Sequence, residues 1–165
     1  MATGQIVAFQ DSDDFAFPRR LETAAYVFTE MCGGNVDLIY TGVRALMDGT
    51  RQIGNIQFGQ ELNPSILPFE DLKHTNPMFT CTVCMRRDVL LLRGGFRREM
   101  VYREDHELWL RTAYHGANFH IVPEPLSLYR IHSGNAELLF LDRDKIWLDE
   151  TLKSYTKPWR SSWVA

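Results

Sequence analysis

The sequence predicts one α/β domain in which a mixed sheet is flanked by helices. Apolar runs rich in β-forming residues alternate along the chain with segments whose apolar residues recur at helical spacing. The first run, residues 6–9, is apolar at every position, which is typical of a central strand covered on both faces. A chain of 165 residues is long enough to form one domain with its own core.

The elements of the first half follow from local patterns. After the strand at 6–9, apolar residues at helical spacing predict a helix over 21–31, with Pro18 near its start and Gly33-Gly34 as its stop. Strands are expected at 36–47 and 52–58, joined at Asp48-Gly49 as a hairpin. Residues 61–77, which carry three prolines, are expected to form a loop or a short helix over the site.

The second half continues the alternation. The expected elements are a strand at 78–85, a short helix from Asp88 to Gly94-Gly95, a helix at 104–114, strands at 119–122 and 126–131, and a terminal helix at 137–155. Residues 1–135 are therefore assigned to the domain body, and residues 136–165 to a C-terminal helix and tail.

Three carboxylates follow the first strand directly. In Asp11-Ser12-Asp13-Asp14, an extended backbone places Asp11 and Asp13 on one side, while Asp14 points elsewhere. Oxygen ligands at the carboxyl end of a buried strand suit Mg²⁺ or Mn²⁺ and a phosphate-bearing substrate. A solvated acidic turn is the structural alternative.

Composition excludes several classes of partner. The 18 Lys and Arg against 21 Asp and Glu give a net charge of −3, which is no electrostatic footprint for nucleic acid. Neither a membrane-spanning run nor a signal sequence is present, so a cytoplasmic location is expected. The three cysteines cannot all pair within one chain, and Cys81 and Cys84 lie on an expected strand where their side chains diverge, which favours a structural role.

Two later clusters strengthen the hypothesis of an active site. Glu104 and Asp105 open a helix, where the helix dipole is expected to keep Asp105 ionised and able to accept a proton from a hydroxyl. The alternative is that Asp105 only caps the helix. In the strand that ends near residue 131, alternation places Arg130 and His132 on one side, as a cation and a potential metal ligand.

Taken in order, these segments resemble the family 2 glycosyltransferases, which have the GT-A fold. The resemblance covers about residues 4–135 and rests on four motifs, namely residues 6–14 with Pro18 and Leu21, residues 85–90 with Gly94-Gly95-Phe96, residues 104–111, and residues 124–132. It implies transfer of a sugar from a nucleotide-sugar donor to a hydroxyl of a saccharide, lipid-linked or protein acceptor, with inversion, in cell-envelope polysaccharide synthesis.

The resemblance also implies roles for individual residues. Asp105 is the general base. The nucleotide sugar is bound by Asp11, Asp13, Asp14 and Arg130. The cation, Mg²⁺ or Mn²⁺, is held by Asp11, Asp13 and His132. The acceptor side is formed by Gly94, Gly95, Phe96 and Glu104. Competing interpretations are a nucleotidyltransferase or phosphohydrolase, which also uses clustered carboxylates, and a truncated domain that only associates.

Members of this family normally carry about a hundred residues before the Asp-x-Asp strand, and these hold the first strands and the pocket for the nucleotide base. The sequence therefore predicts a C-terminal portion of a GT-A domain. The missing part of the domain would be supplied by a longer chain, by a separate N-terminal half, or by another copy of this chain. Alone, it is expected to bind nucleotide sugars poorly and to self-associate through its uncovered first strand. In the tail, two Trp residues lie among cations in residues 157–163, a pattern that suits peripheral membrane contact, although a terminus packed on the domain is the favoured alternative.

Overall fold

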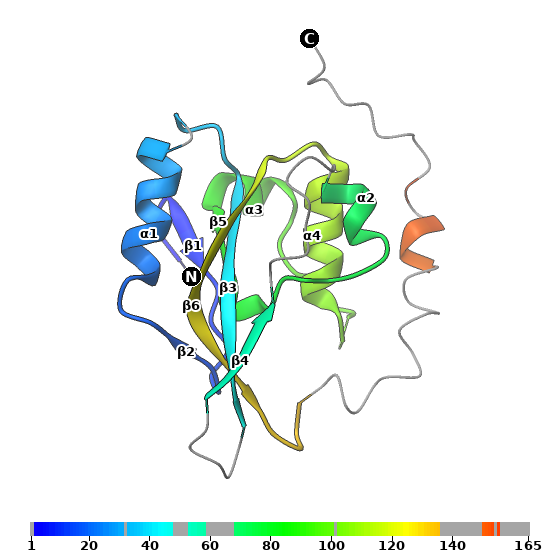
Figure 1. The fold of residues 1–165 in the computed structure, drawn as a ribbon. Helices are drawn as coiled ribbons and strands as arrows, with labels where there is room; N and C mark the ends of the chain where they lie inside the picture. Colours follow the sequence, from blue (N-terminus) through cyan, green and yellow to red (C-terminus); the bar gives the residue numbers. More distant parts are fainter. Residues whose placement is uncertain are drawn as a thin grey trace.

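A mixed sheet with helices on both faces organises the computed structural model, which describes residues 2–31, 33–47, 53–58, 68–100, 102–135, 150–153 and 155 (Figure 1). The strands run in the order β1-β5-β3-β6-β2, and β4 also pairs with β3. The elements are β1 (Ile6–Ala8), β2 (Phe15–Ala16), α1 (Arg20–Tyr26), the π-helix η1 (Val27–Met31), β3 (Leu38–Met47), β4 (Ile53–Phe58), α2 (Pro68–Leu72), the 3₁₀ helix η2 (Thr80–Thr82), β5 (Val83–Arg86), α3 (Arg87–Leu92), α4 (Glu104–Tyr114) and β6 (Phe119–Ile131).

The central pair of the sheet is β3 with β6, the one parallel pairing among the described strands. It runs from Leu38 opposite Phe119 to Met47 opposite Ile131, with an irregularity at Gly42. A Cβ at Gly42 would lie 2.6 Å from the carbonyl oxygen of Pro123, so only glycine fits this close approach of the two backbones. The strands expected at 119–122 and 126–131 are therefore one strand, bent where it passes Gly42.

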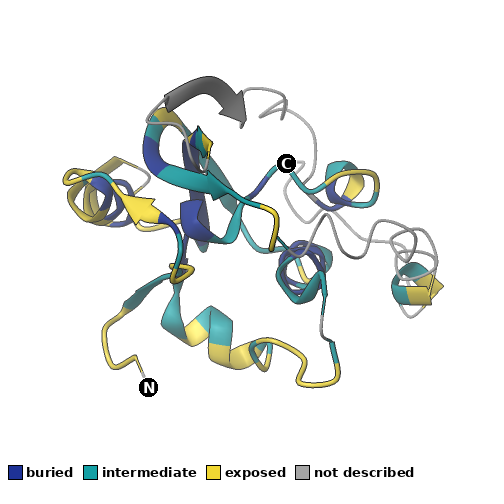
Figure 2. Cartoon of the chain, turned by 90° about the horizontal axis from the view of Figure 1, so that it is seen from below, coloured by how far each residue is buried: buried dark blue, intermediate teal, exposed yellow. Residues whose placement is uncertain are grey.

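The core lies in two parts, one on each face of the sheet. Helix α1 and η1 cover one face, where buried residues of this helical segment pack on Val36, Ile39 and Cys84. Helices α2 and α4 cover the other face, where Leu108, Trp109 and other buried residues of α4 pack on the sheet (Figure 1). Figure 2 shows the buried residues gathered in the sheet and on the helices that pack against it.

The prediction for the first strand is half right. Ile6 and Ala8 pack on the α1 side and Phe9 on the α4 side, as the alternation indicates. The expectation of a central position is wrong, because among the described residues β1 ends the sheet, pairs only with β5 and is half-buried. Its apolar run reflects helical cover on each face rather than strands on both edges.

The strand expected at 78–85 begins only at Val83. Cys81 lies in η2, so the strand argument for diverging sulfurs does not apply. Both Cys81 and Cys84 are buried free cysteines, and burial raises the pKa of each thiol, which keeps them unreactive and supports a structural role.

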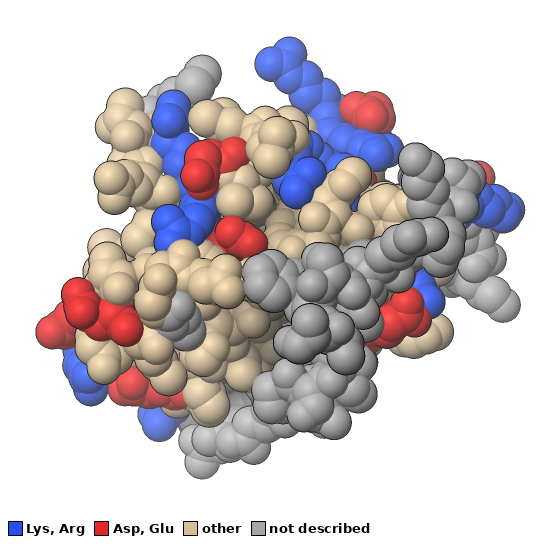
Figure 3. All heavy atoms as spheres, turned by 90° about the horizontal axis from the view of Figure 1, so that it is seen from above, with Lys and Arg blue, Asp and Glu red and all other residues tan. Residues whose placement is uncertain are grey.

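Other predicted elements agree with the structure. The helix at 104–114 is confirmed at both ends, and α1 with η1, α2, α3 and the β3–β4 pairing are confirmed in kind and place. Some predictions fall outside the described residues, namely those for the turn at 48–49, residues 61–67, Cys32, most of the terminal helix at 137–155 and the tail at 157–165. Within the expected terminal helix, residues 150–153 are described and are helical. No described helix has the length and apolar character needed to cross a bilayer. Figure 3 shows the molecule from above the view of Figure 1, and on this face Lys and Arg side chains lie among Asp and Glu side chains.

Candidate active site

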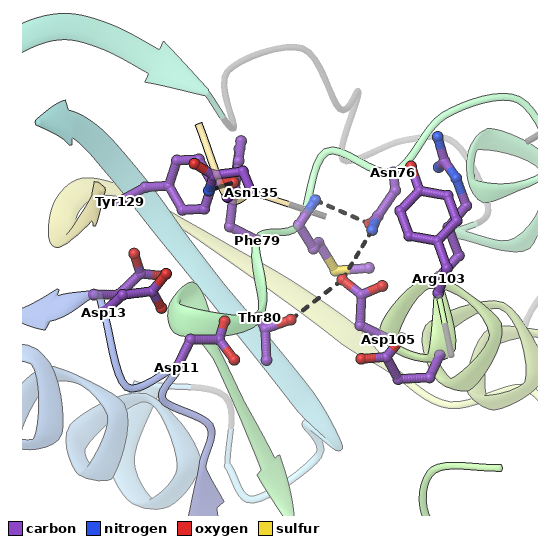
Figure 4. Close-up of a pocket in the computed structure, with 14 residues that line it drawn as sticks. Asp11, Asp13, Asn76, Phe79, Thr80, Arg103, Asp105, Tyr129 and Asn135 are labelled. Atoms are coloured by element: carbon purple, nitrogen blue, oxygen red, sulfur yellow. Dashed lines mark hydrogen bonds between the residues drawn. The ribbon is translucent and has the colours of Figure 1, made fainter. Parts of the chain in front are cut away.

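A cavity of about 410 Å³ lies where the loop after β1, the segment before η2 and the start of α4 meet the end of β6. Figure 4 shows Asp11 and Asp13 on one side of it and Asp105 on the other. Its lining residues are Asp11, Asp13, Asp14, Asn76, Met78, Phe79, Thr80, Tyr102, Arg103, Glu104, Asp105, Tyr129, Gly134 and Asn135. Residues 11–14, called the acidic loop from here on, and the first turn of α4 are far apart in the sequence, but they line the same cavity.

Contacts with α4 and with Arg20 of α1, together with a turn inside the loop, fix the acidic loop. Phe9 packs edge-on against Trp109 of α4, with ring centroids 5.2 Å apart, and the Asp14 N–H donates to the Asp11 carbonyl oxygen at 3.3 Å to close a turn. The guanidinium of Arg20, 2% exposed, donates to the carbonyl oxygens of Phe9 (2.7 Å) and Val83 (3.1 Å) and to Gln10 Oε1 (3.1 Å). A buried cation on α1 therefore ties the end of β1 to β5.

Replacing Arg20 with Met should leave the Phe9 carbonyl oxygen without this donor and loosen the acidic loop. We expect the free energy of unfolding to fall by about 1–3 kcal/mol, measured by urea denaturation, and Mn²⁺ affinity to fall with it. The matched control is Arg19→Met, because the neighbouring Arg19 side chain is 69% exposed and pairs with the exposed carboxylates of Glu22 and Glu124. Equal losses in the two variants would remove Arg20 from this role.

The three carboxylates of the loop have different surroundings. Burial raises the pKa of Asp11, and repulsion from Asp14, Asp13 and Glu104 raises it further. Burial also raises the pKa of Asp14, whose Oδ1 accepts the Arg130 N–H at 2.9 Å. In contrast, the hydrogen bond from His132 lowers the pKa of Asp13. The crowding around Asp11 is an electrostatic strain that a bound cation would relieve.

His132 lies just beyond β6, where its Nε2 is 2.7 Å from Asp13 Oδ2 and its Nδ1 accepts the Gly134 N–H at 3.1 Å. Within the described parts of the chain, no three His, Cys, Asp or Glu side chains are placed to hold a metal ion together. The carboxylates of Asp11 and Asp13 suit a divalent cation, provided that a substrate's phosphate oxygens complete the shell. Both ring nitrogens of His132 are already hydrogen-bonded, so His132 would have to give up one of these bonds to bind the cation.

Replacing Asp13 with Asn should weaken Mn²⁺ binding by about tenfold or more, because one charged ligand and the partner of His132 are lost together. Free Mn²⁺ can be counted by electron paramagnetic resonance during a titration. The control is Asp88→Asn, because Asp88 is an exposed residue in the first turn of α3 whose Oδ1 accepts the Val89 N–H. Identical binding by wild type and Asp13→Asn would remove Asp13 from the site.

Asp105 lies in the first turn of α4, two residues after Arg103, which is the one described non-glycine residue with a positive φ (56°). The pKa of Asp105 rises to about 6, because burial and the charge of Glu104 outweigh the hydrogen bonds to its carboxylate. Burial, which the expectation from the helix dipole left out, thus moves this pKa upward. A carboxyl with a pKa near 6 is still mostly ionised at neutral pH, and it is a stronger base than an ordinary aspartate.

Not every residue predicted for the site lies at the cavity. Glu104 lines it, whereas Gly94, Gly95, Phe96, Arg130 and His132 are not among its lining residues. The Gly94-Gly95 pair turns the chain after α3 with positive φ values, and the ring of Phe96 packs beneath the acidic loop against Phe9, with centroids 5.5 Å apart. In β6, Tyr129 lines the cavity and its neighbour Arg130 does not, so the face of the strand that was predicted to meet the site is the wrong one.

Several lining residues were not found from the sequence. Asn76 and Thr80 reach the cavity from the segment before η2, and Phe79 and Tyr129 form a wall with ring centroids 4.6 Å apart. The Tyr129 hydroxyl accepts a hydrogen bond from Asn135 at 2.7 Å. Neutral and aromatic residues carry no local signal of chemistry, so only the fold identifies them.

Two curated proteins and a solved structure are similar to this chain. No protein-family model matches the chain. It is 26% identical over 160 residues to "Uncharacterized glycosyltransferase MJ1057" of Methanocaldococcus jannaschii, covering 95% of this chain and 52% of that protein. It is 30% identical over 163 residues to "O-antigen biosynthesis glycosyltransferase WbnJ" of Escherichia coli, covering 92% and 58%.

Among solved structures, the crystal structure of S. aureus TarS matches with a TM-score of 0.57 at 18% identity, over 93% of this chain and 28% of that one. This likeness confirms the predicted fold class, a partial α/β fold with a mixed sheet. The sequence relatives support the coarser part of the prediction, a glycosyltransferase. The chain spans about half the length of these curated relatives.

Proposed function

We propose that this chain carries part of the active site of an inverting, metal-dependent glycosyltransferase of family 2 with the GT-A fold. One observation carries the proposal: the acidic loop at Asp11–Asp14 and the high-pKa carboxyl of Asp105 line the same cavity from different elements. The acidic loop suits a cation that is bound to phosphate, and Asp105 suits proton transfer from a hydroxyl. The names of the two sequence relatives support glycosyl transfer over phosphate hydrolysis or nucleotidyl transfer.

In the proposed reaction, an acceptor hydroxyl attacks the anomeric carbon of a nucleotide sugar. The new bond joins the acceptor oxygen to that carbon, Asp105 takes the hydroxyl proton, and the bond to the diphosphate oxygen breaks with its electrons leaving on the nucleoside diphosphate. Attack from the side opposite the leaving group inverts the anomeric centre. In this proposal the two reacting groups would meet in the cavity of about 410 Å³ between Asp105 and the acidic loop.

A divalent cation, Mg²⁺ or Mn²⁺, would be held by Asp13 and Asp11 with His132, and it would supply positive charge to the leaving diphosphate. Asp13 has the lowered pKa of a carboxyl that stays ionised, which suits a ligand role. Arg130 adds charge near Asp13 and supports the same end of the cavity. The acceptor is proposed to be a saccharide of the cell envelope, by analogy with the relative named for O-antigen biosynthesis.

The function is tested by incubating the protein that carries this chain with a panel of nucleotide sugars, Mn²⁺ and saccharide acceptors, and measuring acceptor-dependent release of nucleoside diphosphate. The expected result is release that requires both acceptor and cation, with a product of inverted anomeric configuration by NMR. Release of phosphate or pyrophosphate instead would favour phosphohydrolase or nucleotidyltransferase chemistry and contradict the proposal.

A further inference from the structure

Two uncharged side chains from the segment before η2 reach the carboxylate of Asp105. Asn76 Nδ2 donates to Asp105 Oδ2 at 3.3 Å, and Thr80 Oγ1 donates to the same oxygen at 3.2 Å, as Figure 4 shows. The other oxygen, Oδ1, accepts the His106 N–H at 2.6 Å. The carboxylate thus has one donor from its own helix and two from a different part of the chain.

The segment that carries these donors is itself fixed. At one end the buried ring of His106 bonds through Nε2 to the Leu72 carbonyl oxygen at 2.7 Å, which joins α2 to α4. Asn76 Oδ1 accepts the Met78 N–H at 3.2 Å, so the Asn76 amide is oriented with its nitrogen toward Asp105. The two donors are therefore held in position before any substrate binds.

Several charged and titratable groups lie near Asp105. Glu104, in the same turn of α4, repels the carboxylate, and the His106 ring bonds to Leu72 instead. Arg103 lies at the start of the helix with its guanidinium over the Tyr102 ring, 5.4 Å from the centroid. Asp11 is another anion on the cavity wall, and residues 76–80 contain no charged side chain.

We propose that Thr80 and Asn76 are positioning residues, which hold Asp105 ionised and in one orientation toward the acceptor hydroxyl. The inference rests on the proposed role of Asp105 as general base and extends it to the residues that tune the base. Both hydrogen bonds favour the ionised form, against burial and the charge of Glu104. Removing either donor should therefore make Asp105 protonate at higher pH.

The test is a pH titration of the Asp105 carboxyl carbon by NMR in the 165-residue chain labelled with ¹³C-aspartate. Wild type should titrate with a midpoint near 6. We expect Thr80→Val to raise the midpoint by roughly 0.5–1 pH unit, and Thr80→Ser, which keeps the hydroxyl, to restore it. The matched control is Thr82→Val, because the Thr82 hydroxyl donates to the Phe79 carbonyl oxygen at 2.7 Å.

An unchanged midpoint in a folded Thr80→Val chain, or an equal rise in Thr82→Val, would overturn the proposal. If Thr80→Val does not fold by its amide NMR spectrum, Thr80→Ala and Asn76→Ala must give the same upward displacement. The titration needs no turnover, so it stands apart from the proposed function. If the midpoint rises while the acid limb of the pH–rate profile stays in place, Asp105 is not the base, and the transferase mechanism fails instead.

Discussion

Replacing Asp105 with Asn in the protein that carries this chain should lower kcat by about a hundredfold or more, with little change in donor affinity. Asparagine keeps the shape of the side chain but cannot take the proton of the acceptor hydroxyl. Steady-state kinetics with acceptor at saturation, together with calorimetry for donor binding, separates the two effects. Glu104→Gln is the control, because Glu104 is the adjacent carboxylate on the same cavity.

The pH dependence follows from the same residue. A general base works only when deprotonated, so activity should be present above the pKa of Asp105 and decline as the pH falls through about 6. Removing the negative charge in Glu104→Gln should move this limb to lower pH, because repulsion from Glu104 helps to raise the pKa. If turnover survives in Asp105→Asn and is abolished in Glu104→Gln, the general base is Glu104 and not Asp105.

Replacing Glu107 with Ala should lower the free energy of unfolding by about 3–5 kcal/mol, the cost of breaking a buried ion pair by removing one partner. Glu107 is fully buried on α4, and its carboxylate accepts from Arg111 Nη2 at 2.7 Å and from Arg97 Nε at 3.1 Å. Arg111 also donates to the carbonyl oxygens of Arg93 and Gly95. Without Glu107, the guanidinium that fixes the turn after α3 loses its counter-charge.

Urea denaturation followed by tryptophan fluorescence measures this loss. The comparison variant is Arg97→Ala, since the Arg97 side chain is 43% exposed and a pair made by an exposed cation contributes about 1 kcal/mol or less. Glu107→Ala should therefore be much the more destabilised of the two. Equal, small losses would show that Glu107 is not an anchor of this turn.

The sequence predicts best those features that depend on neighbours in the chain. The helix at 104–114 has an acidic first turn and an apolar face, and its ends are found without any tertiary information. The grouping of the acidic loop with Asp105 in one site rests on the resemblance to the family 2 glycosyltransferases, because each group alone also suits a turn or a helix cap. The cavity that both line supports this grouping.

Features that depend on distant contacts were missed or misjudged. Burial raises the pKa of Asp105 to about 6, and the helix pattern does not reveal this burial. Arg20 looks like one of two adjacent surface arginines, yet it is buried beneath the acidic loop. Thr80 was assigned to a strand, although it opens a 3₁₀ turn and donates to Asp105 from 25 positions away.

The central claim is that the cavity between the acidic loop and Asp105 binds a metal–diphosphate group, and paramagnetic broadening by Mn²⁺ tests it most directly. ¹⁵N spectra of the chain are recorded with Mn²⁺ alone and with Mn²⁺ plus millimolar UDP. We expect UDP to strengthen the broadening and to confine it to the amides of residues 11–14, 102–105 and 129–135, while the amides of Leu91 and Leu92 in α3 stay sharp. Broadening that UDP does not change, or that centres on another part of the chain, would show that the metal–diphosphate group does not bind in this cavity.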